Sequence, residues 1–141
     1  MSKEIITKAA GIIAGKAGEM SGYCTIALID EEGYPTASTI SISKSKGIEW
    51  LTFCVSLDDN KARRIGKCNR ASVCVSSLEY NITLVGTAEI ITDREIKKEM
   101  MLPGACEIWP GGADDPDYCV LRFTTRRYNL YVDEQQVAGT L

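Results

Sequence analysis

Histidine is absent from all 141 residues of the chain. This absence excludes Ser-His-Asp and Cys-His catalysis, together with zinc sites of the His-Glu-x-x-His type. Histidine is also the side chain that most often carries protons near neutral pH. Any chemistry must therefore come from a bound cofactor, from carboxylates, or from lysine, tyrosine or cysteine.

Long hydrophobic runs and an excess of positive charge are also lacking. No apolar run approaches the roughly 20 residues that span a membrane, and the opening segment MSKEIITKAAGIIAGKAGEM is too polar for a secretory signal. The net charge of -3 provides no overall basic field for nucleic acid. We therefore expect no nucleic-acid partner, no membrane partner and a cytoplasmic location.

The cysteines form no Cys-x-x-Cys pair, although the chain contains six of them. Because no export signal is present, we interpret them as reduced thiols rather than as a disulfide framework. Most lie in apolar runs, where a free cysteine behaves as a small hydrophobic residue. The six are Cys24, Cys54, Cys68, Cys74, Cys106 and Cys119.

The hydrophobic pattern predicts one domain over residues 1–141, with three short helices and about seven strands. We expect helices over residues 2–18, 58–68 and 93–101, and read residues 43–47 as a loop. Thr92 and Glu95 are spaced as a capping box for the third helix. The expected strands cover residues 23–29, 36–43, 48–55, 72–78, 82–91, 119–125 and 128–134.

Tight turns join most of these strands, which predicts a mainly antiparallel sheet that closes into a barrel. The turn over residues 30–35 contains Gly33 and Pro35 and should form a hairpin. Gly86, in the middle of the fifth strand, indicates a bulge or a bend. The fold class is therefore mainly β with short helices.

A polar corner joins the third strand to the second helix in the segment EWLTFCVSLDDNKARRIGKCN. Asp58 is a suitable N-cap for this helix. Lys61 lies in the first turn, where a cation opposes the helix dipole. A helix N-terminus can hold an anion, so a lysine here is more easily explained if it reaches a bound phosphate. A self-capped helix with a solvated basic face remains the alternative.

Two further segments have both a functional and a structural interpretation. Hydroxyl side chains crowd the stretch TASTISIS, where they could bond a ribityl or phosphate group or could line a solvated sheet face. In WPGGADDPDY, aspartates could bind a hard cation, but Asp-Pro and Gly-Gly pairs favour a turn without a metal. Trp109 in the same segment reads as an exposed aromatic residue and hence as a hint of binding.

The order of these segments resembles the FMN-binding split β-barrel proteins related to pyridoxamine 5'-phosphate oxidase, in particular the general stress protein 26 group. The most specific likeness is IWPGGADDPDYCVLRF, and DEEGYPTAST, LTFCVSLDDNKARRI and VGTAEIITD support it in the same order. The resemblance covers nearly the whole chain and implies a six- to seven-stranded antiparallel split β-barrel. It also implies a homodimer with two FMN sites between the barrels.

The resemblance implies which residues approach the cofactor. We expect no metal site. Strand residues should flank the flavin, Asn60 and Lys61 should meet its phosphate, and two aromatic residues should lie near it across the dimer interface. The implied FMN-binding residues are Ser38, Thr39, Ile40, Phe53, Cys54, Val55, Asn60, Lys61, Trp109 and Tyr131. No catalytic side chain is identified.

Two positions depart from the family pattern. Ser38 stands where the family often has an arginine, and Asp59 stands where a small hydroxyl residue is common. Each change could weaken phosphate binding by ~1–3 kcal/mol, because a charge-assisted contact is lost or a carboxylate is added. Asp59 would not repel the phosphate if its side chain turned away or capped the helix.

These features lead to two functional hypotheses. The first is an FMN-dependent oxidoreductase of unknown substrate, with a nicotinamide or a small oxidant as a possible partner. The second is a non-catalytic flavin-binding or stress protein, or a degenerate member with a weakened FMN site. Oxidation of pyridoxamine phosphate itself is not expected, since the sequence displays no basic cluster for a second phosphate.

Overall fold

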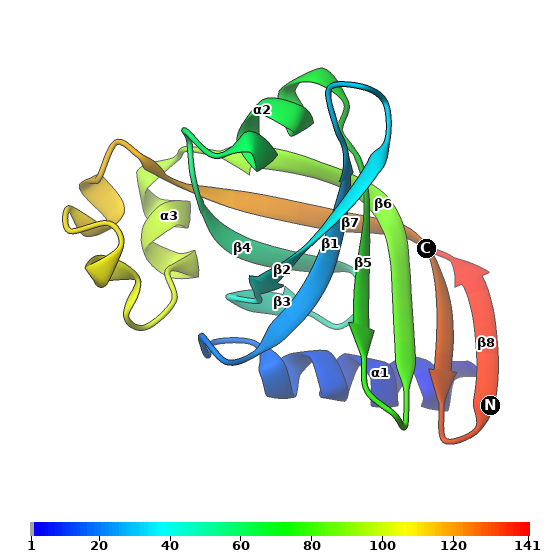
Figure 1. Ribbon diagram of the computed structural model, residues 1–141. Coiled ribbons are helices and arrows are strands. Elements are labelled where there is room, and N and C mark those ends of the chain that lie inside the picture. Colours follow the sequence, from blue (N-terminus) through cyan, green and yellow to red (C-terminus); the bar gives the residue numbers. More distant parts are fainter. Residues whose placement is uncertain (1) are drawn as a thin grey trace.

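A computed structural model describes residues 2–141 (Figure 1). The helices are α1 (Ser2–Lys16), α2 (Asn60–Lys67) and α3 (Arg94–Met100), and two short 3-10 turns, η1 (Ala105–Glu107) and η2 (Gly112–Asp114), follow α3. The strands are β1 (Tyr23–Ile29), β2 (Pro35–Ser41), β3 (Lys44–Lys46), β4 (Trp50–Ser56), β5 (Arg70–Ser76), β6 (Asn81–Ile91), β7 (Tyr118–Val132) and β8 (Gln135–Thr140).

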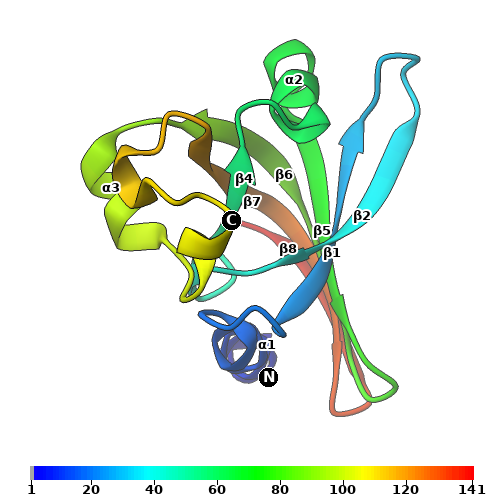
Figure 2. The same ribbon diagram turned by 60° about the vertical axis from the view of Figure 1, so that its left-hand side comes forward.

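The eight strands within residues 2–141 form one antiparallel sheet in the order β2-β1-β5-β6-β7-β4-β3, with β8 paired to β7. The sheet curls, and its two ends, β2 and β3, do not pair with each other (Figures 1 and 2). Helices α1 and α2 lie at opposite ends of the curled sheet (Figure 1). This is the antiparallel split barrel that the sequence predicts.

Local sequence explains the first hairpin. The Asp30 carboxylate accepts hydrogen bonds from the backbone N–H groups of Glu32 (2.9 Å) and Tyr34 (3.0 Å). It also accepts one from the Thr36 hydroxyl (2.9 Å), and these bonds lower the pKa of Asp30. An aspartate that bonds its own turn in this way fixes the connection between β1 and β2.

Gly86 forms the predicted irregularity in β6. Val85 pairs with Arg127 and Gly86 pairs with Thr125, so Arg126 is an extra residue on β7 with no opposite partner on β6. A Cβ atom on residue 86 would lie 1.9 Å from the carbonyl oxygen of Thr124. Only glycine permits this approach, and the bulge re-aims the side chain of Arg126.

Two hydrophobic clusters make up the core. The larger one fills the curled sheet beneath α1, where Ile5, Ala9 and Ile13 are buried at the helical spacing that the sequence predicts. The smaller one lies outside β4, between the sheet and the segment from α3 to η2. It consists of Met100, Leu102, Ala105, Trp109, Tyr118 and Val120.

Several boundaries differ from the sequence prediction. Residues 44–46 form the short strand β3 rather than a loop, because they pair with residues 50–52 of β4. One continuous strand, β7, replaces the two strands expected at the end, and the polar segment QQVAGT forms β8. Pairing with β4 and β7 determines these strands, and local sequence does not encode it.

Both predicted helix caps are displaced by one residue. Asp59, not Asp58, caps α2, and Asp93, not Thr92, caps α3, with its carboxylate accepting from the backbone N–H of Ile96 (3.1 Å). In each case two capping residue types stand side by side, and the sequence alone does not choose between them. Among the described residues, no helix combines the length and apolar character that crossing a bilayer requires.

Candidate functional site

The predicted phosphate corner lies where β4 leads into α2. The Asp59 carboxylate accepts a hydrogen bond from the backbone N–H of Lys61 (2.9 Å), and its other oxygen lies 3.8 Å from the Lys61 ammonium nitrogen. Lys61 is mostly covered, with 17% of its side chain exposed. The cap therefore partly neutralises the lysine that the sequence assigns to a phosphate, while Asn60 beside it is exposed.

Three of the predicted cofactor residues meet at a small hollow on the outer side of β4. Ile40 of β2, Cys54 of β4 and Trp109 of the segment after η1 all line it. Its volume is about 90 Å³. The remaining lining residues, which sequence reasoning did not identify, are Met20, Ser41, Leu102, Ala105 and Ile108.

Trp109 is buried rather than exposed, which corrects the sequence interpretation. Only 6% of the residue is accessible, and its indole N–H donates to the Ser56 hydroxyl over 3.1 Å. Its ring lies 5.1 Å from the ring of Tyr118, between centroids. Trp109 thus anchors the irregular segment against β4, because Ser56 is the last residue of that strand. The two residues lie 53 positions apart in the sequence.

Cys54 faces this hollow as a neutral thiol. Its Sγ donates to the carbonyl oxygen of Met100 (3.4 Å) and lies 3.7 Å from the Tyr118 hydroxyl. Burial raises the pKa of the Cys54 thiol. A protonated, hydrogen-bonded thiol is a poor nucleophile, so Cys54 can contribute a wall of the site but not covalent catalysis.

The other predicted strand residues divide into buried and exposed groups. Phe53 and Val55 point into the larger core, at 0% and 3% exposure, so only their backbone can face a ligand. Ser38 and Thr39 are exposed on β2, opposite Ile26 and Thr25 of β1. Their hydroxyls are available to solvent or to a ligand.

Tyr131 lies far from the hollow within one chain. Cys54 pairs with Val120 near the start of β7, whereas Tyr131 lies near its end, roughly 35 Å further along the strand. Tyr131 is 43% exposed, next to the fully exposed Leu78 of the turn between β5 and β6. A single chain therefore does not bring Tyr131 together with Ile40, Cys54 and Trp109.

The aspartate-rich segment forms a turn, as the sequence favours. The Asp115 carboxylate accepts from the backbone N–H groups of Gly111 (3.1 Å) and Asp117 (3.0 Å). Asp114 forms an ion pair with Arg94 (2.6 Å), which lowers the pKa of Asp114. Within residues 2–141 no cluster of side chains has the arrangement of a metal site.

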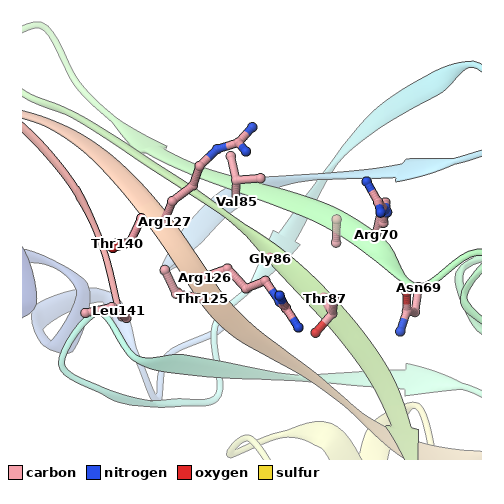
Figure 3. A pocket seen from close by; sticks show the side chains of 11 residues that line it. Asn69, Arg70, Val85, Gly86, Thr87, Thr125, Arg126, Arg127, Thr140 and Leu141 are labelled. Atoms are coloured by element: carbon pink, nitrogen blue, oxygen red, sulfur yellow. The ribbon is translucent and has the colours of Figure 1, made fainter.

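A basic hollow lies at the β6 bulge, where the sequence shows no basic cluster. Arg70 of β5 and Arg126 and Arg127 of β7 line an open hollow of about 860 Å³ (Figure 3). Arg70 and Arg126 are more than 50 positions apart in the sequence. Sheet pairing alone brings these arginines together, so no local motif reveals the cluster.

Comparison with known proteins identifies the family. The sequence pattern of pyridoxamine 5'-phosphate oxidase matches residues 16–131. The match covers more than half of the chain, which therefore belongs to the pyridoxamine 5'-phosphate oxidase family. None of the curated protein sequences matches the chain.

Solved structures share the fold. A Clostridium acetobutylicum protein related to general stress protein 26 has a TM-score of 0.84 at 22% identity, covering 100% of this chain and 97% of its own. A Nostoc punctiforme protein described as pyridoxamine 5'-phosphate oxidase-related and FMN-binding has a TM-score of 0.68 at 15% identity, covering 99% and 95%. A heme-binding protein from Mycobacterium smegmatis has a TM-score of 0.72 at 22% identity, covering 96% of this chain and 57% of that protein.

Proposed function

We propose that the chain binds FMN between two copies of itself and acts as an FMN-dependent oxidoreductase. The observation that carries the proposal is the meeting of Ile40, Cys54 and Trp109 at the outer side of β4. These residues offer an apolar wall for a flat ring system. Ser56 is hydrogen-bonded to Trp109 and is the last residue of β4, and the polar corner connects it to the N-terminus of α2.

A second copy is part of the proposal because one chain does not enclose a flavin. The hollow measures about 90 Å³, whereas pockets for cofactors and drug-sized ligands measure roughly 300–1,000 Å³. Ser38 and Thr39 beside it are exposed. In the proposed homodimer, Tyr131 would reach this site from the partner.

In this site the residues of the chain position and shield the cofactor. Ile40, Cys54 and Trp109 would exclude water from one face of the ring. Ser38, on the same face of β2 as Ile40, would bond the ribityl chain, whereas the Thr39 side chain points to the other face. Lys61 and Asn60 would hold the phosphate at the start of α2. Bound FMN supplies hydride or electron transfer, so the absence of histidine is no obstacle.

We favour FMN over heme, the ligand named for one structural neighbour, because the chain belongs to the pyridoxamine 5'-phosphate oxidase family and another neighbour is described as FMN-binding. Heme iron is held by histidine, cysteine, methionine or tyrosine; this chain has no histidine, although Met20 lines the small hollow. Cys54 is a neutral, hydrogen-bonded thiol.

We also propose a cytoplasmic location. All six cysteines are free, as expected for a reducing compartment.

The proposal is tested by titrating FMN into the purified protein and into its Lys61→Ala variant. Loss of a charged phosphate contact should weaken the affinity about tenfold or more. Lys67→Ala, on the exposed last turn of the same helix, is the matched control and should leave the Kd unchanged. Equal Kd values for all three proteins would show that the phosphate lies elsewhere.

Asp59→Ser tests the weakness of the corner. Serine also caps helices, so α2 should persist while the Lys61 ammonium loses its carboxylate neighbour. FMN affinity should therefore rise, and an unchanged or weaker affinity would contradict this account of Asp59.

The alternative function is flavin binding without turnover. The Asp59–Lys61 contact favours it, because a partly neutralised phosphate site binds more weakly. Mixing the yellow, FMN-loaded protein with NADH or NADPH separates the two functions. Rapid bleaching of the visible absorbance supports the oxidoreductase and a nicotinamide partner. The alternative predicts that the colour stays stable with both donors. It also predicts that the chemically reduced protein is reoxidised by small oxidants no faster than free FMN.

A further inference from the structure

The hollow at the β6 bulge has the composition of an anion site. Its lining contains three arginines and no aspartate or glutamate, in a chain whose net charge is -3. In Figure 3, Arg127 reaches from β7 across β6 toward β5, and Arg126 extends along β6 toward Thr87 and Asn69. Arg70 stands at the start of β5, beside Thr87, its register partner.

In the described part of the chain, none of the three arginines has an acidic partner, in contrast to Arg64 and Arg94. Arg64 lies 3.6 Å from the Glu31 carboxylate, and Arg94 lies 2.6 Å from that of Asp114. Across the part of the chain that the structure describes, the ion pairs include none formed by Arg70, Arg126 or Arg127. All three side chains are exposed to solvent, so their mutual repulsion is screened, and an anion bound among them would gain attraction from each guanidinium.

The backbone is shaped to present one of the three. Arg126 is the extra residue of the bulge, and the bulge depends on Gly86, where a Cβ atom would meet the Thr124 carbonyl oxygen at 1.9 Å. The carbonyl oxygen of Arg126 accepts from the backbone N–H of Leu141 (2.8 Å), which fixes the bulged residue from its other side. Thr125 is buried whereas Arg126 and Arg127 are both exposed, so the bulge interrupts the regular alternation and leaves two consecutive arginines open to solvent.

We propose that Arg70, Arg126 and Arg127 bind the diphosphate group of a small, nucleotide-sized ligand. A diphosphate matches the three positive charges, and planar guanidinium groups bind phosphate oxygens in pairs. The volume of about 860 Å³ is larger than a single phosphate needs and suits a nucleotide. Thr87, Thr140 and Asn69 in the same lining provide groups for sugar hydroxyls. Lys61 is not part of this lining, so the proposal does not depend on the FMN site.

The test is calorimetric titration of the full chain with inorganic pyrophosphate, with inorganic phosphate for comparison. Pyrophosphate should bind saturably and more tightly than phosphate. Arg126→Gln and Arg127→Gln should each weaken the pyrophosphate Kd about tenfold or more. Arg94→Gln removes the same charge outside the hollow and should leave this Kd unchanged.

Other outcomes would overturn the proposal. Absence of saturable pyrophosphate binding, or an equal loss in Arg94→Gln, would reduce the arginines to a solvated surface. Binding of a single-stranded oligonucleotide that depends on Arg126, without binding of pyrophosphate, would identify a nucleic-acid surface instead. FMN titration of Arg126→Gln keeps this site distinct from the cofactor site: an FMN affinity reduced as much as that for pyrophosphate would merge the two and refute a separate site.

Discussion

Strands β4 and β2 both border the candidate cofactor site, yet they are built in opposite ways. On β4, Leu51 and Phe53 are buried in the larger core, and Trp50 and Cys54 on its other side pack against the smaller cluster. On β2, Ser38 is exposed although its register partner Ile26 is fully buried. One wall of the site is thus packed on both faces, and the other is open.

The difference indicates how the site would be completed. A strand that is packed on both faces holds its backbone in place, which suits a wall that must position a ring system. An edge strand with exposed faces has unpaired backbone groups and room for another surface. In the proposed dimer, β4 would supply the fixed geometry of the site and β2 the surface on which ligand and partner settle.

The largest difference in stability between substitutions in β4 and in β2 is expected at Phe53. Phe53→Ala should lower the free energy of unfolding by about 3–5 kcal/mol, because a fully buried ring would leave a cavity. Thr39→Ala on β2 should change it by no more than about 0.5 kcal/mol. Urea unfolding of both variants measures the contrast, and similar losses would mean that β2 is packed in solution.

A smaller effect is expected at Ser56, on the outer side of β4. Ser56→Ala removes the acceptor of the buried Trp109 indole N–H and should cost about 1–3 kcal/mol of stability. Ser38→Ala, the same change on β2, is the control and should be close to neutral. Tryptophan fluorescence during urea unfolding reports both, and a neutral Ser56→Ala would remove this anchor from the account.

The smallest effect is a pH dependence of stability that arises from a buried thiol on β1, next to the end of β2. Cys24, the register partner of Ile40, has its thiol pKa raised to about 12 by burial, from about 8.5 in an unfolded chain. Stability should therefore be constant below the unfolded pKa and fall as the pH rises toward the folded one. At pH 10 the loss from this thiol is on the order of 2 kcal/mol at most.

Urea unfolding at several pH values between 8 and 10 tests this slope (roughly the range in which an unfolded thiol ionises). Cys24→Ala should flatten the alkaline decline relative to the unmodified chain, even where the substitution itself changes stability at pH 7. Cys106→Ala, at an exposed thiol, should leave the decline as it is. Parallel curves for all three proteins would assign the decline to other groups.

Local patterns predicted those parts of the fold that local interactions determine. The hairpin at Asp30 and the buried face of α1 follow from side chains a few residues apart. The burial of Trp109 could not be predicted, because it depends on Ser56. Strand β3 escaped prediction because its sequence, Lys-Ser-Lys, is polar and only its pairing with β4 makes it a strand.

The candidate site was predictable to the same extent. Resemblance selected Ile40, Cys54 and Trp109, and the structure places them around one hollow. The pairing of Lys61 with Asp59 was foreseeable only as one option, since a cap and a repelling charge look alike in sequence. The arginine hollow depends on the register of β5, β6 and β7, which composition does not encode.

Strand β7 contributes to both hydrophobic clusters: Val120 belongs to the smaller one, and Leu121, Phe123 and Leu130 belong to the larger. Neither cluster can open fully without disturbing this shared strand. The backbone amides at its centre should therefore exchange with deuterium only through global unfolding, whereas those of β2 exchange through local fraying.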